Sequence, residues 1–274
     1  MALLGHPMAV SIPDTVLEDK DSLREKTAKL GTIARACAIY GVDIIEVFRD
    51  TGGHGEVQVM RKVLEYLETP QYLRRRLYPL DEALRFAGML PPLRIPSHKA
   101  KVPLAELKTG EVREGVTNGD GTVDIGLDSA PRLVAPVTQG KRVTVRISSI
   151  GPLSAQPIPR GDVPGYWGYE VETKSIGELL SDQRFPLRIA TSRMGKPLGL
   201  AVKGLRDNLR GARGVKMVFG SPSRGLFDIL GPDLERRVES VINLFPEQEV
   251  ETVRTEEAIF AGLGLVALLS AEKA

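Results

Sequence analysis

Three strand-and-loop segments in the C-terminal half most constrain how this chain folds: Leu187–Gly195, Val215–Leu226 and Val241–Ala258. In the first two, a short apolar run ends in a turn rich in glycine, serine and proline, and the third continues into a longer polar loop. Sequence of helical character follows each. This alternation is typical of α/β proteins with a parallel sheet, in which ligands bind beyond the carboxyl ends of the strands. The two glycines of the loop Phe219–Gly225 would let the backbone approach a ligand closely.

The N-terminal part predicts the same alternation. A buried strand is expected at Met8–Ile12 and a β-rich strand at Val42–Phe48. Between them, apolar residues recur at helical spacing over Leu30–Tyr40, and the same spacing returns over Val57–Leu67. This part therefore predicts a strand–helix–strand unit of a parallel sheet.

The middle of the chain changes character after Pro91, Pro92 and Pro96, which cannot continue a helix or a central strand. Short β-type runs then alternate with turns, and the NGDG sequence at 118–121 predicts a hairpin. The runs predict a small OB-like barrel at 93–173, inserted into a discontinuous α/β domain of residues 1–92 and 174–274. Its predicted strands are Gly110–Val116, Thr122–Leu127, Arg132–Val137, Arg142–Ile147 and a further one near Tyr166–Glu172.

Composition narrows the class of protein. A chain of 274 residues with 42% hydrophobic residues can bury a large core, and its net charge of +2 neither demands nor excludes nucleic acid. Cys37 is the only cysteine, so no disulfide forms within the chain, which fits a cytoplasmic location. The start lacks the pattern of a signal peptide, and the apolar run Ile259–Leu269 is too short to cross a bilayer, so no membrane partner is expected.

Several kinds of site are disfavoured by the motifs. His6, His54 and His98 lie far apart, and no histidine or cysteine cluster has metal-ligand spacing, so no metal is expected. The chain has no Walker loop, no GxGxxG after a strand and no GxSxG elbow. Nucleoside triphosphates, NAD and a serine hydrolase mechanism are therefore disfavoured.

The C-terminal segments resemble a known family. FGSPSRGL (219–226), the loop with Asn243 and Pro246, and VRTEEA (253–258) resemble the cofactor half of the SPOUT methyltransferases. Within that superfamily, the chain is similar to the archaeal and eukaryotic RNA uridine N3 methyltransferases that carry an inserted OB-like domain. The resemblance covers nearly the whole chain. It implies S-adenosylmethionine as cofactor, a deep trefoil knot in the parallel sheet and a homodimer.

The resemblance also implies which residues bind the cofactor. They lie in three loops, at Thr191–Ser192, Phe219–Gly225 and Leu244–Thr255. In the third loop, relatives of this family tend to have Gln-Gly where this chain has Gln248 followed by Glu249. A side chain at that position would reshape the third loop. The implied cofactor residues are Thr191, Ser192, Phe219, Gly220, Ser221, Pro222, Gly225, Leu226, Asn243, Leu244, Pro246, Val253, Arg254, Thr255 and Ala258.

A second match lies on the predicted N-terminal helix. GTIARACAIYGVD (31–43) is similar to the N-terminal motif of many SPOUT enzymes, in which a helix arginine acts at the target, and this implies a catalytic role for Arg35. Because a guanidinium stays charged at neutral pH, Arg35 would orient the base or stabilise negative charge on it. The alternative is a surface or packing arginine.

VRTEEA resembles the RTE segment of bacterial enzymes that methylate uridine at N3 in ribosomal RNA. This implies catalytic roles for Arg254, Glu256 and Glu257, with one glutamate pairing with Arg254 or accepting the N3 proton. The alternative is structural. Thr255 is a good N-cap, and two glutamates in a first turn favour the helix dipole.

Basic residues are candidates for contacts with RNA phosphates. The densest stretch, Arg74–Arg76, has the alternative of a solvated helix face, and acidic residues are nearly as numerous as basic ones in the inserted domain. Trp167 or Tyr166 would stack on a base. The predicted RNA-binding residues are Arg74, Arg75, Arg76, Lys99, Lys101, Arg113, Lys141 and Arg142.

Together these features predict an S-adenosylmethionine-dependent RNA methyltransferase that acts on N3 of a uridine in ribosomal RNA. Two alternatives stay open. One is a non-catalytic RNA-binding protein on the same fold, which Glu249 favours and which VRTEEA (253–258) and Arg35 oppose. The other is a methyltransferase that acts on transfer RNA or on the ribose 2′-hydroxyl, since the cofactor loops do not read the acceptor.

Overall fold

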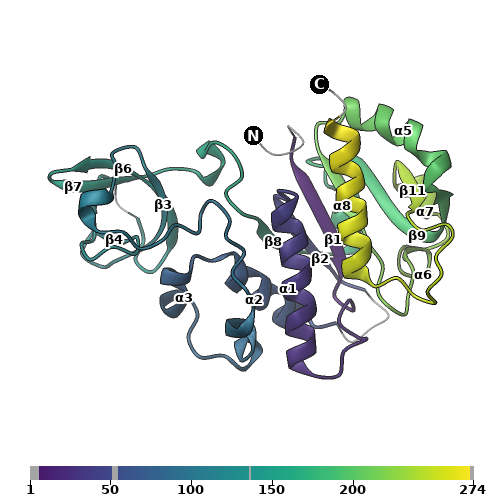
Figure 1. Cartoon of the computed structure of the whole chain (residues 1–274), viewed down its shortest axis with the longest axis horizontal. Coiled ribbons are helices and arrows are strands. Elements are labelled where there is room, and N and C mark those ends of the chain that lie inside the picture. The colour runs from purple at the N-terminus through teal and green to yellow at the C-terminus, as the bar shows by residue number, and fades with distance from the viewer. Residues whose placement is uncertain (1–5, 51–54, 136, 272–274) are drawn as a thin grey trace.

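The chain forms two sheets, one of six strands and one of five, which lie side by side along the long axis of the molecule (Figure 1). The computed structural model describes residues 6–50, 55–135 and 137–271. His54 therefore lies outside the described residues. The predicted α/β class with a parallel sheet is confirmed.

All neighbouring strands of the larger sheet run parallel, in the order β11-β9-β10-β1-β2-β8. Its inner strands are nearly continuous runs of apolar and β-branched residues, as expected for a sheet covered on both faces. The order places β9, β10 and β11 next to one another. The strands are β1 (Met8–Pro13), β2 (Ile44–Phe48), β8 (Glu170–Lys174), β9 (Leu187–Pro197), β10 (Val215–Val218) and β11 (Ser240–Asn243).

Four longer helices cover one face of this sheet and enclose the main apolar core. Helix α1 packs against both α2 and α8, and α8 also packs against α5. Figure 1 shows α1 and α8 next to each other in front of the sheet. The helices are α1 (Leu23–Ile39), α2 (Val57–Glu68), α5 (Leu198–Arg210) and α8 (Thr255–Ala271).

The opposite face carries shorter helices and a second apolar cluster, in which Phe48 and Val218 from the sheet are buried. Helix α4 contacts β2 and β8, α6 contacts β9, and α7 contacts β11. These helices are α4 (Ile176–Ser181), α6 (Leu226–Leu230) and α7 (Leu234–Arg237). Among the described residues, no helix combines the length and apolar character that crossing a membrane requires.

The second sheet is a nearly closed barrel with the strand order β4-β3-β6-β7-β5. An isolated bridge between Thr122 and Arg132 connects its two ends. The predicted NGDG turn is present: the N–H of Asn118 donates to the carbonyl of Thr122 at 2.8 Å, and Gly121 has a φ of +79°. The strands are β3 (Val112–Thr117), β4 (Val123–Asp124), β5 (Arg132–Leu133), β6 (Arg142–Ile150) and β7 (Leu153–Pro157).

Two predictions about these elements were wrong. The strand expected in the barrel near Tyr166–Glu172 is β8, which pairs with β2 at the edge of the parallel sheet. The fifth barrel strand is instead β7, which was not predicted; Pro152 precedes it and Pro157 is its last residue. Helix α1 begins at Leu23 rather than near residue 30, because Ser22 and Glu25 form a capping box at its start.

The barrel is fixed to the larger domain by a cluster of charges beside α2. Glu68, at the end of α2, accepts hydrogen bonds from Arg142 (Nη1–Oε2 2.6 Å) and Arg160 (Nη2–Oε1 2.6 Å). Arg142 also donates to Glu114 (Nε–Oε2 2.7 Å), and the ring N–H of Trp167 donates to the other oxygen of Glu114 at 2.6 Å. Two guanidinium groups thus balance two carboxylates. Helix α3 (Gln71–Leu77) adds contacts with β3 on the same side.

Candidate functional site

The three predicted loops meet at the carboxyl ends of the adjacent strands β11, β9 and β10. Their side chains join them: Thr191 Oγ1 donates to the carbonyl of Val218 (3.3 Å), and Asn243 Nδ2 donates to the carbonyl of Arg193 (2.9 Å). Thr255 Oγ1, at the start of α8, donates to the carbonyl of Gly220 (3.3 Å). The structure therefore brings together the three loops that the resemblance assigned to cofactor binding, whereas the side chains of Phe219 and Leu226 are buried in the apolar clusters.

The first loop is a bulge inside β9. Strand β11 pairs Val241 with Ala190 and then Ile242 with Lys196, so the residues between Ala190 and Lys196 have no partner on β11. Gly195 returns the chain to β11, and a Cβ at this position would lie 2.7 Å from the carbonyl carbon of Ile242. Only glycine allows this close approach of two backbones.

The second loop is held in place by residues that follow β1. Within the loop, the N–H of Ser221 donates to the carbonyl of Arg224 at 3.0 Å. Glu18 Oε1 accepts hydrogen bonds from Ser221 Oγ (2.8 Å) and Ser223 Oγ (2.6 Å). The guanidinium of Arg224 pairs with the buried carboxylate of Asp50, which follows β2. The loop therefore depends on the ends of both neighbouring strands.

The third loop ends at the N-terminus of α8, where one prediction needs correction. Arg254, not Thr255, is the N-cap: its carbonyl accepts the N–H of Ala258 (3.0 Å), and its own N–H donates to Glu257 Oε2 (2.9 Å). Glu257 thus caps the helix in the way that the third residue of a capping box does. Thr255 is the first helical residue, and its hydroxyl is free to contact the second loop.

Glu256 points away from solvent, with 8% of its surface exposed. Its Oε2 lies 3.5 Å from Nζ of Lys29 on α1 and makes no hydrogen bond with the described residues. The same ammonium donates to Asp19 at 2.7 Å. Glu256 and Glu257 therefore differ in environment, one buried beside a cation and one exposed at the helix cap.

Glu249 stands in the third loop where relatives tend to have glycine, and this loop keeps its own hydrogen bonds there. Glu249 is exposed, and the side chain of the preceding Gln248 donates to the carbonyls of Val250 (2.9 Å) and Glu251 (3.2 Å). The side chain of Gln248 therefore holds the third loop together next to Glu249.

Arg35 lies outside this group of loops. It is exposed on α1 and donates from Nη1 to the carbonyl of Leu93 at 2.8 Å. Lys29 of the same helix reaches the start of α8, and Arg35 follows six residues later, about 9 Å further along the helix axis. Because α1 runs antiparallel to the strands, this displacement leads away from their carboxyl ends. Within one subunit, Arg35 does not face the cofactor loops.

The predicted RNA-binding residues divide into two groups. Arg75, Arg76, Lys99, Lys101 and Lys141 are exposed, although Arg76 Nη1 also donates to Asn118 Oδ1 (2.9 Å) and Asp124 Oδ2 (3.1 Å) in the barrel. The side chains of the other three are taken up by structural contacts, so their placement does not support contact with phosphate: Arg74 donates to the carbonyls of Thr69 and Leu67, Arg113 to Glu111 and the carbonyl of Ala100, and Arg142 to Glu68 and Glu114. Trp167, expected to stack on a base, is buried against Glu114.

Five residues that support the loops were not predicted. They are Glu18, Asp19, Lys29, Asp50 and Arg224. Except for Asp19, which pairs with Lys29, their partners lie far away along the chain, Glu18 and Ser221 being 203 positions apart. The one available signal was that Glu18 and Asp50 follow strands at their carboxyl ends.

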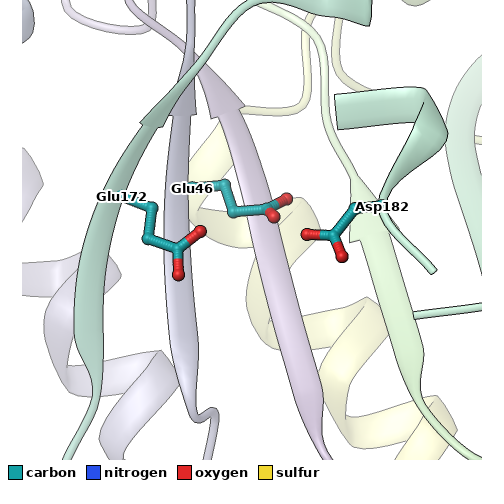
Figure 2. Close-up of side chains that lie close together, drawn as sticks. All are labelled: Glu46, Glu172 and Asp182. Atoms are coloured by element: carbon teal, nitrogen blue, oxygen red, sulfur yellow. The ribbon is translucent and has the colours of Figure 1, made fainter. Parts of the chain in front are cut away.

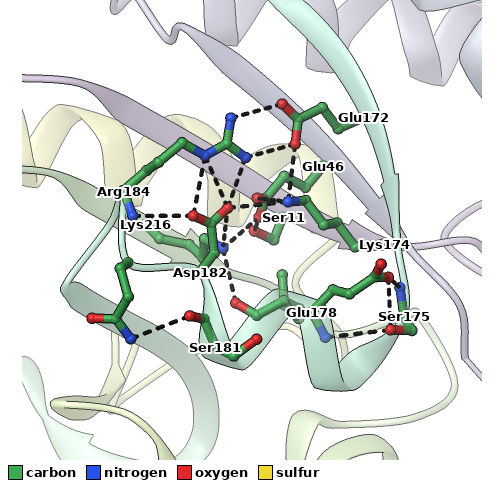
Figure 3. A network of polar contacts seen from close by, with 12 residues as sticks. Ser11, Glu46, Glu172, Lys174, Ser175, Glu178, Ser181, Asp182, Arg184 and Lys216 are labelled. Atoms are coloured by element: carbon green, nitrogen blue, oxygen red, sulfur yellow. Dashed lines mark hydrogen bonds and ion pairs between the residues drawn. The ribbon is translucent and has the colours of Figure 1, made fainter.

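A cluster of three carboxylates lies on the other face of the sheet (Figure 2): Glu46, Glu172 and Asp182. Figure 3 shows that cations lie among them. Lys216 is 2.9 Å from Glu46, Lys174 is 3.1 Å from both Glu172 and Asp182, and Arg184 is 2.7 Å from the same two carboxylates. Hydrogen bonds from Arg184 hold the pKa of Asp182 well below its usual range, and burial lowers the pKa of Lys216. Three cations thus account for the three carboxylates as a structural network.

Two cavities lie near the functional elements. One of about 360 Å³ is lined by Arg142, Arg160 and Glu114 at the barrel junction, and one of about 340 Å³ lies along β11 between Lys196 and Ile242. Neither is lined by residues of the second loop. The convergence of the three loops therefore rests on their hydrogen bonds rather than on either cavity.

A parallel α/β sheet with three joined loops at its carboxyl edge, and an attached barrel, defines a ligand-binding protein of the two-domain α/β class. Residues 7–266 match the family model described as "Putative RNA methyltransferase", and the chain belongs to that family. The resemblance to archaeal and eukaryotic RNA methyltransferases is thereby confirmed.

Curated relatives agree with this family. An uncharacterized protein of Halobacterium salinarum is 34% identical, over 95% of this chain and 98% of the relative. The human protein named 28S rRNA (uridine-N(3))-methyltransferase is 32% identical, over 94% of this chain and 78% of its own length. Among solved structures, a protein titled as a methylase family member from Neisseria gonorrhoeae covers 97% of this chain and 83% of its own, with 11% identity and a TM-score of 0.42, too low to support an argument from shape.

Proposed function

We propose that this protein transfers a methyl group from S-adenosylmethionine to N3 of a uridine in the ribosomal RNA of the large subunit. The observation that carries the proposal is the junction of three loops at the carboxyl ends of β11, β9 and β10 in a chain of an RNA methyltransferase family. Relatives from human and mouse, each 32% identical, are named 28S rRNA (uridine-N(3))-methyltransferases.

The loops suit a nucleoside-type methyl donor. When bound, S-adenosylmethionine supplies an electrophilic methyl group on a sulfonium, so the protein mainly has to hold this group in line with the acceptor. The tight turn at Gly220, where a Cβ would lie 2.9 Å from the carbonyl oxygen of Arg224, presents backbone groups. Leu244 and Ala258 are half-buried and add apolar surface beside them. Such a mixture of backbone and apolar groups fits an adenosine with a charged tail.

The acceptor chemistry requires a proton to leave. In the proposed reaction, N3 of uridine forms a bond to the methyl carbon, the bond between that carbon and sulfur breaks, and the N3 proton passes to a base. Glu256 and Glu257 at the start of α8 are the candidates, as both follow Arg254 at the third loop. Glu257 is exposed, and Glu256 keeps one carboxylate oxygen free of hydrogen bonds. Arg254 is exposed and would contact the RNA or the uracil.

We also propose a homodimer in which a second copy covers the outer face of α8. Helix α8 is apolar on its outer side as well, where Leu268 is 61% exposed, and Ile39 on neighbouring α1 is 49% exposed. A helix that is apolar all round is usually buried. A second copy placed there would bring Arg35 of one subunit toward the cofactor loops of the other, which explains why Arg35 faces away from the loops of its own subunit.

The barrel would hold the RNA. Its exposed Lys99, Lys101 and Lys141, with Arg75 on the adjacent helix α3, supply positive charge for phosphate contacts, whereas the charge of Arg76 is partly balanced by Asp124. The OB type of the barrel and the trefoil knot are part of the same proposal. The knot is supported by the path of the last residues, which cross from β11 past the β9 loop to pack α8 on α1 and α5. A cytoplasmic location is proposed with them.

The test separates donor binding from methyl transfer. The purified protein is titrated with S-adenosylmethionine in a calorimeter and then incubated with methyl-labelled donor and large-subunit ribosomal RNA. We expect donor binding and label in the RNA. Glu256→Gln and Glu257→Gln test which residue accepts the proton, and Arg35→Ala tests the role of the arginine. All three variants should bind the donor normally. Methyl transfer should be lost in Arg35→Ala and in at least one of the two glutamate variants. Donor binding without transfer to any RNA would contradict the proposed acceptor, and no donor binding would favour a non-catalytic RNA-binding protein.

A further inference from the structure

The backbone at Arg94 is strained. Its φ of +54° is the only positive φ of a residue other than glycine in the described part of the chain. The left-handed conformation is unfavourable for a residue with a Cβ, and such strain persists where the surrounding structure imposes it. Arg94 is exposed, so the strain does not serve to bury its side chain. It directs the residue into solvent at a defined place in the linker between the two sheets.

That place is next to Arg35. Arg35 Nη1 donates to the carbonyl of Leu93 at 2.8 Å, and this carbonyl belongs to the peptide unit that precedes Arg94. The Cα of Arg94 therefore lies within about 6 Å of the Arg35 guanidinium, given standard peptide dimensions. The contact continues along α1, because a Cβ at Gly31, one turn earlier, would lie 2.9 Å from the side chain of Leu90. The linker thus follows α1 and presents Arg94 beside Arg35.

Neither guanidinium has an anionic partner. Within the described ranges, Arg35 makes the one bond to the Leu93 carbonyl, and the side chain of Arg94 has no hydrogen bond or ion pair. Arg85, in the same connecting region, differs because its guanidinium pairs with Glu82 at 3.1 Å. Two unpaired guanidinium groups on side chains that start this close together repel each other, and an anion bound by both would offset the repulsion. The planar N–H groups of arginine match the oxygens of a phosphate.

We propose that Arg35 and Arg94 together form a site for one phosphodiester group of the RNA, adjacent to the nucleotide that is methylated. This inference rests on the proposed function, because Arg35 is the residue assigned to the target. The strained backbone fixes the Cα of Arg94, and the bond from Arg35 to the Leu93 carbonyl holds the Arg35 guanidinium within about 6 Å of it, so both side chains can reach one phosphate. Arg94 is then a positioning residue for the RNA backbone.

The first test measures RNA affinity by fluorescence anisotropy with a labelled transcript of large-subunit ribosomal RNA at two or more salt concentrations. Arg94→Met and Arg35→Met should each weaken binding by about tenfold and reduce the slope of log affinity against log salt by about one. Because both contact one phosphate, the double variant should lose less than the product of the two single losses. Arg85→Met is the matched control and should bind as the unaltered protein does.

The second test uses the strain itself. Arg94→Gly removes the unfavourable backbone conformation, so its melting temperature should equal or exceed that of the unaltered protein while its RNA affinity falls as in Arg94→Met. A lower melting temperature would show a structural role and overturn the proposal. Unchanged RNA affinity in Arg94→Met, or strictly multiplicative losses in the double variant, would overturn it as well.

The measurements separate this inference from the function on which it rests. RNA affinity is read without methyl transfer, and donor affinity is read by calorimetry, which Arg94→Met should leave unchanged. An unaltered protein that binds RNA through Arg94 but transfers no methyl group would contradict the proposed reaction alone. Normal methyl transfer and normal RNA affinity in Arg94→Met would contradict the phosphate site alone.

Discussion

Glu18 and Ser221 lie 203 positions apart in the chain, yet Oε1 of the glutamate accepts the serine hydroxyl at 2.8 Å. The same oxygen accepts the N–H (3.2 Å) and the hydroxyl (2.6 Å) of Ser223. A single carboxylate after β1 thus organises the loop after β10. The shape of the proposed cofactor loop is set by a residue outside it.

Replacing Glu18 by alanine should weaken donor binding, because three hydrogen bonds that hold the loop are lost. Each such bond contributes about 1 kcal/mol, and loss of even part of this total corresponds to about a tenfold increase in the dissociation constant. Calorimetric titration with S-adenosylmethionine measures the change. Asp21→Asn removes a nearby exposed carboxylate of the same segment and serves as the control. Equal affinity in Glu18→Ala and Asp21→Asn would show that Glu18 does not shape the loop.

Gly195→Ala should disrupt the first loop, because its Cβ would meet the backbone of Ile242 at 2.7 Å. The backbone has to move, so we expect weaker donor binding and a loss of about 1 to 3 kcal/mol in the free energy of unfolding. Gly199→Ala is the matched control in α5, where a Cβ would meet nothing within 4 Å. Alanine favours a helix, so this control should be neutral or stabilising by up to about 1 kcal/mol. Similar behaviour of the two variants in thermal unfolding and donor titration would contradict the assignment.

The buried pair of Lys216 and Glu46 should contribute to stability only as a pair. The two charges lie 2.9 Å apart with side chains that are 0% exposed, and Lys216 also donates to the carbonyl of Leu179 in α4. Lys216→Met leaves a buried carboxylate without its main counter-ion, which should cost about 3 to 5 kcal/mol in urea unfolding. Combining it with Glu46→Gln should cost less than the two single changes together. Glu82→Gln, which removes an exposed pair with Arg85, should cost less than about 1 kcal/mol, and an equal cost at both sites would refute the account.

His98 predicts a pH dependence of stability. Burial lowers the pKa of this imidazole from 6.5 to about 4, and its Nε2–H donates to the carbonyl of Glu68 at 2.7 Å. The imidazole of His98 takes up a proton at a higher pH in the unfolded chain than in the folded chain. Its contribution to the free energy of unfolding is therefore complete above pH 6.5 and is lost as the pH falls toward 4. The loss would approach about 3 kcal/mol. His98→Gln lacks this dependence, so the stability difference between the two proteins should shrink from pH 7 to pH 4, and parallel curves would contradict the assignment.

Much of the larger sheet could be predicted from local pattern. Apolar runs such as Val215–Val218 and the helical spacing around Ile33 depend on residues close together in the chain, and the periodicity reports them directly. The gathering of the loops at Ser192, Gly220 and Leu244 was also expected, since parallel strands present their carboxyl ends at one edge. These features follow from rules that act over a few residues or over the whole sheet.

The failures concern contacts between distant residues. Arg74, Arg113 and Arg142 have the same chemical character as the exposed Arg75, and only the folded chain shows that three of them are held by carbonyls or carboxylates. The support of Ser221 by Glu18 leaves no local pattern for the same reason. The strand at 170–174 was wrongly assigned to the barrel, because the sequence pattern of an edge strand with one polar side is the same in a barrel and in a parallel sheet.

The most direct test of the central claim is the identity of the methylated nucleoside. Large-subunit ribosomal RNA is treated with the protein and labelled S-adenosylmethionine, digested, and analysed by mass spectrometry. The account predicts labelled 3-methyluridine, absent when the protein carries both Glu256→Gln and Glu257→Gln. Label in a 2′-O-methylated nucleoside, in another base or in transfer RNA alone would contradict the assignment of N3 of a ribosomal uridine.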